Sequence, residues 1–212
     1  MSAVVLLGGG GHCRSVIDVI EQTGLYSILG VLEKEGFSRS EIMGYPMLGS
    51  DHDLPAFIEQ NYAVVITIGQ IKTSESREKL YRHAKEAGAE MPVVVSPRAY
   101  VSRHAKVDSG TTVMHEAIVN CSAEIGENCI INTNALVEHD AKIGNHTHIA
   151  TGALLNGGVQ IGQRCFIGSG VVIHNDIDIG DGCIIGAGTI VRTNLPDGTV
   201  LKSQQAAIGT AR

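Results

Sequence analysis

Aromatic residues are scarce in this chain of 212 residues, which contains no tryptophan, three phenylalanines and five tyrosines. A core therefore cannot depend on a few bulky aromatic anchors. The sequence instead contains many valines and isoleucines together with 26 glycines. This mixture favours a fold whose core consists of repeated small aliphatic layers.

Long apolar runs and blocks of like charge are also missing. The apolar stretch at the N-terminus is too short to span a bilayer and has no basic flank. The net charge of −6 argues against a surface that binds nucleic acid. We therefore expect a cytoplasmic protein that acts on neither membranes nor nucleic acids.

The cysteines do not form a disulfide pattern. Their number is odd, no CxxC pair occurs, and nothing suggests secretion, so we do not expect a disulfide framework. The five positions are Cys13, Cys121, Cys129, Cys165 and Cys183.

What the sequence does contain is a repeat with a period of six. A helix does not fit this period, and a simple strand repeats every two residues, whereas hexapeptide periodicity is typical of a parallel β-helix. The position four residues after each leading aliphatic is small or aliphatic as well. Sixteen leading positions follow without interruption: Val101, Val107, Val113, Val119, Ile125, Ile131, Val137, Ile143, Ile149, Leu155, Ile161, Ile167, Ile173, Ile179, Ile185 and Val191.

This block resembles the hexapeptide-repeat acyltransferases, whose fold is a left-handed β-helix. The resemblance implies three hexads per coil, so that residues 18 apart stack about 4.8 Å from each other. Cys129, Cys165 and Cys183 then all occupy the small interior position. We expect them to fill the core, because a buried cysteine behaves as a small hydrophobe.

The first 97 residues predict a small Rossmann-like α/β domain. We expect strands within 3–7, 27–35, 62–69 and 90–97, and helices within 12–24, 50–60 and 74–88. The glycines at 8–11 lie between the first strand and helix, where backbone N–H groups favour a phosphate. The third glycine of a dinucleotide fingerprint is replaced by Cys13, so a nucleotide carrying one sugar fits better. A tight turn that needs positive φ is the alternative.

The two halves together resemble the acetyltransferases of nucleotide-linked amino sugars, of the bacillosamine and perosamine type, and the related sialic acid O-acetyltransferases. The resemblance covers nearly the whole chain. It implies a nucleotide-sugar-binding domain over residues 1–97 and a β-helix over 98–212. It also implies a homotrimer that holds acetyl-CoA in a groove between β-helices, with no metal.

The family element N-T-x-x-x-x-E-H-[ED] stands here as NTNALVEHD, residues 132–140. By this resemblance His139 is the general base, and Asp140 orients it and raises its basicity. Asn132 matches an asparagine near the reacting amine. A neutral imidazole suits the removal of a proton from an attacking amine, because its unperturbed pKa is about 6.5.

The resemblance also assigns ligand-binding positions. The residues expected to contact acetyl-CoA are His148, Gly157, Ser169 and Ala187. Those expected to contact the nucleotide sugar are Gly10, Gly11, His12, Glu33, Lys34 and Gly69. Two departures concern Lys34, where the family often has a second acid, and the C-terminal LKSQQAAIGTAR, which replaces a segment that usually closes the CoA site.

Several alternatives remain open at this stage. O-acetylation of a sialic-acid-like sugar would use the same base, because hydroxyl and amine acceptors both lose a proton. A zinc site of the carbonic-anhydrase-like kind would need three of His115, His139, His146 and His148. A trimeric scaffold without catalysis is the third. Individually, His139 could be an exposed charged corner, His12 a helix cap and His146 a surface residue.

Overall fold

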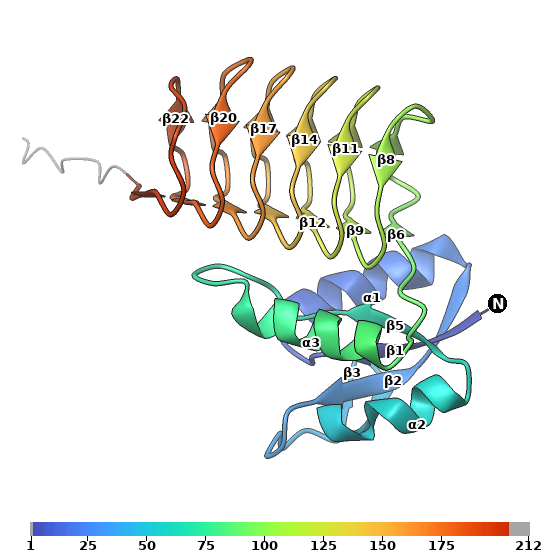
Figure 1. The fold of residues 1–212 in the computed structure, drawn as a ribbon. Coiled ribbons are helices and arrows are strands. Elements are labelled where there is room, and N and C mark those ends of the chain that lie inside the picture. The colour runs from blue at the N-terminus through green and yellow to red at the C-terminus, as the bar shows by residue number, and fades with distance from the viewer. Residues whose placement is uncertain (1, 204–212) are drawn as a thin grey trace, which may run out of the picture.

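A five-stranded sheet with helices on both sides forms the N-terminal part of the computed structural model, which describes residues 2–203 (Figure 1). The sheet order is β3-β4-β2-β1-β5, and all pairings are parallel except the β3–β4 hairpin. The strands are β1 Ser2–Leu7, β2 Tyr26–Glu33, β3 Glu41–Ile42, β4 Tyr45–Ser50 and β5 Ala63–Ile66. The helices are α1 Gly11–Thr23, α2 Leu54–Glu59 and α3 Glu75–Glu86, with a 3₁₀ turn at Asp51–Asp53.

Local sequence explains these elements. Val4, Val5, Leu6 and Leu7 of β1 are all buried, as expected for a central parallel strand covered on both faces. Helix α1 buries one stripe of its surface, and it ends at Gly24, whose φ of 62° is left-handed. The expected α/β domain is therefore present.

From residue 94 the chain winds into a left-handed parallel β-helix of two-residue strands, which form three sheets. We name its three faces by their surroundings. The covered face comprises β6 Val94–Val95, β9 Thr112–Val113, β12 Ile130–Ile131, β15 His148–Ile149, β18 Phe166–Ile167, β21 Ile184–Ile185 and β23 Val200–Leu201. The apolar face comprises β7 Tyr100–Val101, β10 Ile118–Val119, β13 Leu136–Val137, β16 Leu154–Leu155, β19 Val172–Ile173 and β22 Ile190–Val191. The polar face comprises β8 Lys106–Val107, β11 Glu124–Ile125, β14 Lys142–Ile143, β17 Gln160–Ile161 and β20 Asp178–Ile179.

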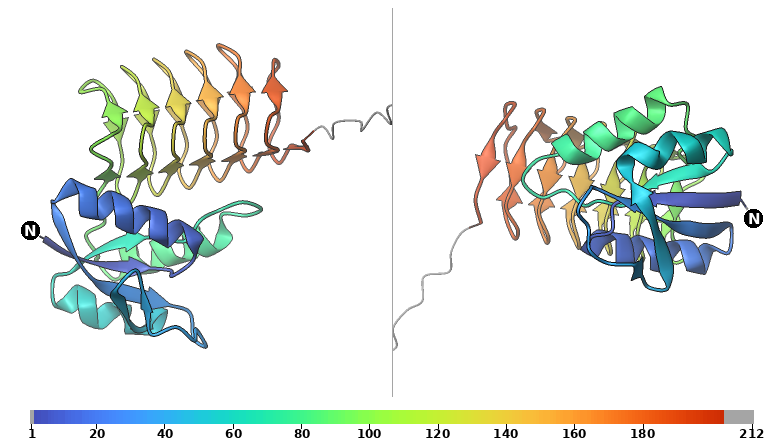
Figure 2. Two further views of the ribbon diagram at one scale, coloured as in Figure 1. Left: turned by 180° about the vertical axis from the view of Figure 1, so that it is seen from behind. Right: turned by 90° about the horizontal axis from the view of Figure 1, so that it is seen from below.

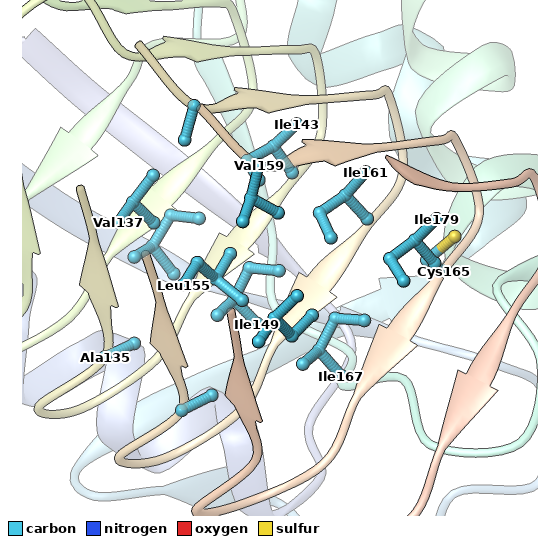
Figure 3. Packing of buried hydrophobic residues seen from close by; sticks show 14 of the residues in the cluster. Ala135, Val137, Ile143, Ile149, Leu155, Val159, Ile161, Cys165, Ile167 and Ile179 are labelled. Atoms are coloured by element: carbon cyan, nitrogen blue, oxygen red, sulfur yellow. The ribbon is translucent and has the colours of Figure 1, made fainter. Parts of the chain in front are cut away.

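The period of six is confirmed by burial and by register. Neighbouring strands pair residues 18 apart, as in Ile131 with Ile149. The second residue of every strand from β9 to β22 points inward and is at most 4 % exposed. Figure 3 shows these aliphatic side chains and Cys165 filling the interior. Cys129, Cys165 and Cys183 are completely buried there, as expected for core filler.

A left-handed residue recurs in successive hexads of the β-helix and turns the chain from one face to the next. The φ angle is positive every six residues from Glu116 to Gly188. Asp140, with a φ of 61°, and His146, with 58°, occupy this position. Glycine, asparagine and aspartate tolerate such angles best. The turn geometry thus decides where the polar side chains of each coil lie.

The N-terminal part packs against the covered face, while the strands of the polar face lie on the far side (Figures 1 and 2). Helix α1 contributes Asp18, whose carboxylate lies 2.8 Å from His115 Nε2. Helix α3 contributes Lys85, which pairs with Glu127 at 2.7 Å. These contacts fix the N-terminal part beside the second coil of the β-helix, which contains both His115 and Glu127.

Two details of the N-terminal part differ from expectation. The strand expected within 90–97 forms at Val94–Val95, but it pairs with β9 of the β-helix rather than with the N-terminal sheet. The fourth long strand of that sheet is β4, which the sequence did not indicate. Residues 204–212, most of the unusual C-terminal segment, lie outside the described residues.

Candidate active site

His139 and Asp140 form a pair on the turn between β13 and β14. The Asp140 carboxylate accepts a hydrogen bond from His139 Nδ1 at 2.8 Å, and the His139 side chain is 54 % exposed. This hydrogen bond, together with the charges of Asp140, Glu138 and Asp176, raises the pKa of His139 above its usual value. Because Nδ1 carries the proton in this pair, Nε2 keeps a free lone pair and can act as a base.

Local backbone geometry produces this arrangement. Asp140 occupies the left-handed position of its hexad, next to the histidine that its carboxylate orients. Glu138 supports the turn, since its Oε2 accepts bonds from the His139 backbone N–H at 3.1 Å and from Asn120 Nδ2 at 2.9 Å. The turn therefore presents an oriented imidazole at the surface.

Gly157 lies one coil further on, beneath the imidazole. A Cβ built at residue 157 would stand 2.6 Å from His139 Cε1 and 3.3 Å from Asn175 Nδ2. The structure therefore brings Gly157 together with His139 and Asp140. Its role beside acetyl-CoA stays a prediction.

Three other predicted residues of the β-helix lie on a different edge. Asn132, Ser169 and Ala187 are on the turns between the covered and apolar faces, at positions 132–135 and their equivalents 18 residues apart. We call this row the covered–apolar edge. His139, Asp140 and Gly157 belong to the apolar–polar edge, formed by 138–141 and its equivalents. Within one chain, the width of the apolar face separates the two groups.

His148 lies on the covered face between the β-helix and the N-terminal part. Its side chain is buried, and its ring packs edge-on against Phe166 with 5.3 Å between centroids. The His12 ring lies 6.5 Å away, between centroids. Burial lowers the pKa of His148 to about 4 and that of His12 to about 3, so both rings are neutral near pH 7.

The glycine-rich loop and the carboxyl ends of the sheet form a second concave region. Gly8 has a φ of 105°, which agrees with a tight turn, while a Cβ at Gly10 or Gly11 would meet open space. Glu33 Oε2 accepts a hydrogen bond from Gly9 N at 2.5 Å. Gly69 packs against His12, with 3.5 Å from its built Cβ to His12 Cβ.

A cavity of about 490 Å³ lies near this loop, although none of the glycines at 8–11 lines it. Its position at the carboxyl ends of β2, β4 and β5 is where ligands bind in parallel α/β sheets. The lining residues are Glu33, Lys34, Asp51, His52, Ile68, Ser76, Lys79, Leu80 and His83. The predicted pair Glu33 and Lys34 therefore borders a ligand-sized space.

Sequence reasoning missed Arg77, a buried cation at the boundary between the two parts. Its side chain is 1 % exposed, and burial lowers its pKa to about 10. Nη1 donates to the carbonyls of Ile66 and Ile68, and Nε donates to the carbonyl of Asn128 in the β-helix. Arg77, Tyr81 and Ala84 share the buried stripe of α3, and this helical spacing was the one available signal.

The apolar face carries a continuous row of large outward side chains. They are the first residues of its strands: Tyr100, Ile118, Leu136, Leu154, Val172 and Ile190. Tyr100, Ile118, Leu154 and Ile190 are 38–58 % exposed. The equivalent row on the polar face is Lys106, Glu124, Lys142, Gln160 and Asp178. Exposed apolar rows of this kind mark interaction surfaces.

Within residues 2–203, no group of three or more histidine, cysteine, aspartate or glutamate side chains is placed to hold a metal ion. None of the helices in that range has the length and apolar character needed to cross a bilayer.

Comparison with known proteins supplies independent information. The family model for the PglD N-terminal domain matches residues 3–84. The model for the bacterial transferase hexapeptide (six repeats) matches residues 122–157 and 158–193. No curated protein matches the chain.

Three solved structures are similar over nearly their whole length. PerB from Caulobacter crescentus, in complex with CoA and GDP-perosamine, is 32 % identical, with 94 % of this chain and 93 % of that chain covered and a TM-score of 0.88. The acetyltransferase domain of PglB from Neisseria gonorrhoeae, in complex with acetyl coenzyme A, is 26 % identical, with 93 % and 94 % covered and a TM-score of 0.87. WeeI from Acinetobacter baumannii is 26 % identical, with 95 % and 97 % covered and a TM-score of 0.84.

Proposed function

Because the chain belongs to the hexapeptide-repeat sugar acetyltransferases that carry a PglD N-terminal domain, we propose that it acetylates a nucleotide-linked amino sugar. The acyl donor is acetyl-CoA, and the acceptor is the 4-amino group of a UDP- or GDP-linked 4-amino-4,6-dideoxy sugar. Such a product serves the synthesis of surface polysaccharides or glycans.

His139 is the general base in this proposal. The amine nitrogen attacks the thioester carbonyl carbon, a C–N bond forms, and the amine proton passes to His139 Nε2. The C–S bond then breaks, and the imidazolium returns the proton to the leaving CoA sulfur. Asp140 keeps Nδ1 protonated and stabilises the imidazolium, as the carboxylate does in a catalytic triad. No covalent enzyme intermediate is needed.

The N-terminal part supplies the acceptor site. Gly10 and Gly11 at the start of α1 suit the diphosphate, because backbone N–H groups at a helix N-terminus attract anions. The adjacent cavity of about 490 Å³, with Glu33 and Lys34 on its wall, suits the nucleoside. His12 lies between this loop and the β-helix, where the sugar has to reach the acetyl group.

Association into a ring of three would bring the predicted residues of the covered–apolar edge next to those of the apolar–polar edge. In a closed ring built around the apolar face, each chain presents one edge of that face to each neighbour. The covered–apolar edge of one protomer, with Asn132, Ser169 and Ala187, then meets the apolar–polar edge of the next, with His139. Burial of the apolar row would drive this association. Acetyl-CoA would lie in the groove between the two edges.

The observation that carries the proposal is the oriented His139–Asp140 pair above Gly157, at the border of an exposed apolar face. The test is release of CoA thiol from acetyl-CoA in the presence of UDP- and GDP-linked 4-amino sugars, with mass spectrometry of the product. A mass increase of one acetyl group on the amine supports the proposal. A sialic-acid-like sugar is included as a further acceptor, and acetylation of its hydroxyl alone would assign O-acetyl transfer to the protein instead. Absence of thiol release with every acceptor would contradict the proposed function.

A further inference from the structure

Gln70 connects the N-terminal part to the covered face through two hydrogen bonds. It lies on the loop between β5 and α3. Its backbone carbonyl accepts a bond from His148 Nδ1 at 2.6 Å, and its Nε2 donates to the Cys165 carbonyl at 3.1 Å. The His148 backbone N–H donates to the same Cys165 carbonyl at 2.9 Å. One residue of the N-terminal part therefore forms hydrogen bonds to two successive coils.

These contacts fix the tautomer of His148. A backbone carbonyl can only accept, so Nδ1 must carry the proton. Asn132 Nδ2 lies 3.1 Å from Nε2 and is a donor, so Nε2 must carry the lone pair. Both partners require the same neutral ring, which agrees with the lowered pKa of His148. With both nitrogens engaged, this imidazole neither takes up nor releases a proton in the reaction.

The orientation of the Asn132 amide follows from two independent contacts. Its Oδ1 accepts the Thr133 backbone N–H at 2.8 Å, and its Nδ2 faces His148. The amide N–H₂ has two hydrogens, and only one is used in this pair. The next residues of the same row are Ala150, Gly168 and Gly186. Between residues 132 and 186, Asn132 thus carries the one long polar side chain of its row on the covered–apolar edge.

We propose that Asn132 donates its second N–H to the thioester carbonyl oxygen, and that Gln70 and His148 are positioning residues that hold its amide for this task. The proposal deepens the acetyl transfer proposed above and depends on it. An oxygen that gains charge in the tetrahedral intermediate is stabilised by a preoriented donor. The attacking amine is a poorer partner, because a donor on its lone pair would oppose attack. The N-terminal part, through Gln70, thereby orients the Asn132 amide of the β-helix.

The test is a double-mutant cycle between residues 132 and 148, measured by steady-state kinetics with saturation of each substrate in turn. Asn132→Ala should lower kcat by about 10²–10³-fold, the usual cost of one oxyanion donor. His148→Phe, which keeps the packing against Phe166, should lower kcat about tenfold while KM for acetyl-CoA changes less than about twofold. Since His148 acts through Asn132, the double variant should be no slower than Asn132→Ala alone.

Two results would overturn the proposal. Additive effects in the double variant would show that His148 acts independently of Asn132. A rise of about tenfold or more in KM for acetyl-CoA in His148→Phe would make His148 a direct ligand of the cofactor. Gln70→Ala removes only the bond to the Cys165 carbonyl, and it repeats the test if His148→Phe does not fold. Gln70→Ala should lower kcat less than His148→Phe does, and this effect should be absent when residue 132 is already alanine. Inactivity of the wild-type protein with every acceptor would instead contradict the proposed function.

Discussion

The imidazole of His139 lies against the bare Cα of Gly157, so that a Cβ at residue 157 would stand 2.6 Å from Cε1 and 2.7 Å from Nε2 of the ring. The two residues are 18 apart and therefore occupy the same place on successive coils, which stack about 4.8 Å apart. Only a glycine leaves room for the ring in the position where Asp140 holds it.

Gly157→Ala should displace the His139 ring and lower turnover by about 100-fold, because a shift of about 1 Å in a catalytic group costs about that much. The free energy of unfolding should change little, since the His139 side chain is exposed and free to move aside. Steady-state kinetics and urea unfolding measure the two effects. Gly182→Ala is the matched control, because a Cβ there meets open space although its φ of 65° is strained. Equal activity of the two variants would contradict a catalytic His139.

The pH dependence of turnover should report the pKa of His139. The base must be neutral, and its pKa is raised by Asp140, so activity should fall as the pH drops through a value above about 6.5. Asp140→Asn removes the main cause of the raised pKa, and it should move this acid limb to lower pH while reducing the plateau. Asparagine tolerates the left-handed φ of 61° at this position, so the fold should persist.

His139→Ala is the companion variant for this profile. It should lower turnover by about 10²–10⁴-fold and remove the acid limb. An unchanged profile in both variants would assign the proton transfer to another group.

Leu154→Glu should prevent association, because it places a charge in the middle of the exposed apolar row. Light scattering should show a trimer for the wild-type protein and a monomer for the variant, with loss of acetyl transfer. Gln160→Glu is the matched control, since residue 160 has the same place in the strand on the polar face. A variant that stays trimeric would show that the apolar face is not the interface.

Arg77→Ala should destabilise the protein by about 3 kcal/mol, since three carbonyls, two of them in buried hydrogen bonds, lose this donor and a cavity remains. The exposed Arg82 on the same helix offers the control Arg82→Ala, which should change the free energy of unfolding by less than about 0.5 kcal/mol. Urea unfolding measures both. Equal stability of the two variants would show that the buried guanidinium does not hold the two parts together.

The repeated part of the fold was predictable because its contacts are local. Each coil pairs with residues 18 positions away, so the period of six in Val, Ile and Leu already specifies which side chains point inward. The helices of the N-terminal part were predictable from their apolar spacing. Strand β4 was not, because its YPMLGS sequence contains proline and glycine and has no strong alternation.

The site was predictable in part. The EHD sequence indicated His139 and Asp140, and their hydrogen bond forms between adjacent residues. The repeat places Asn132 and His139 in successive hexads, and therefore on different edges, but it could not show which of the three faces the N-terminal part covers. The contacts of Gln70 and Arg77 were also hidden. They arise only when the N-terminal part packs on the covered face, across separations of 51 to 95 residues.

The central claim is that His139 of one protomer acts at the covered–apolar edge of its neighbour. The most direct measurement is acetyl transfer by mixed trimers of His139→Ala and Asn132→Ala chains, co-expressed with different tags and purified through both. Each variant alone should be nearly inactive. Every mixed trimer that carries both tags pairs an intact His139 with an intact Asn132 at one of its three interfaces, so about a third of wild-type activity should return. Activity no higher than that of the two separate variants would place both residues in one protomer's site and contradict the account.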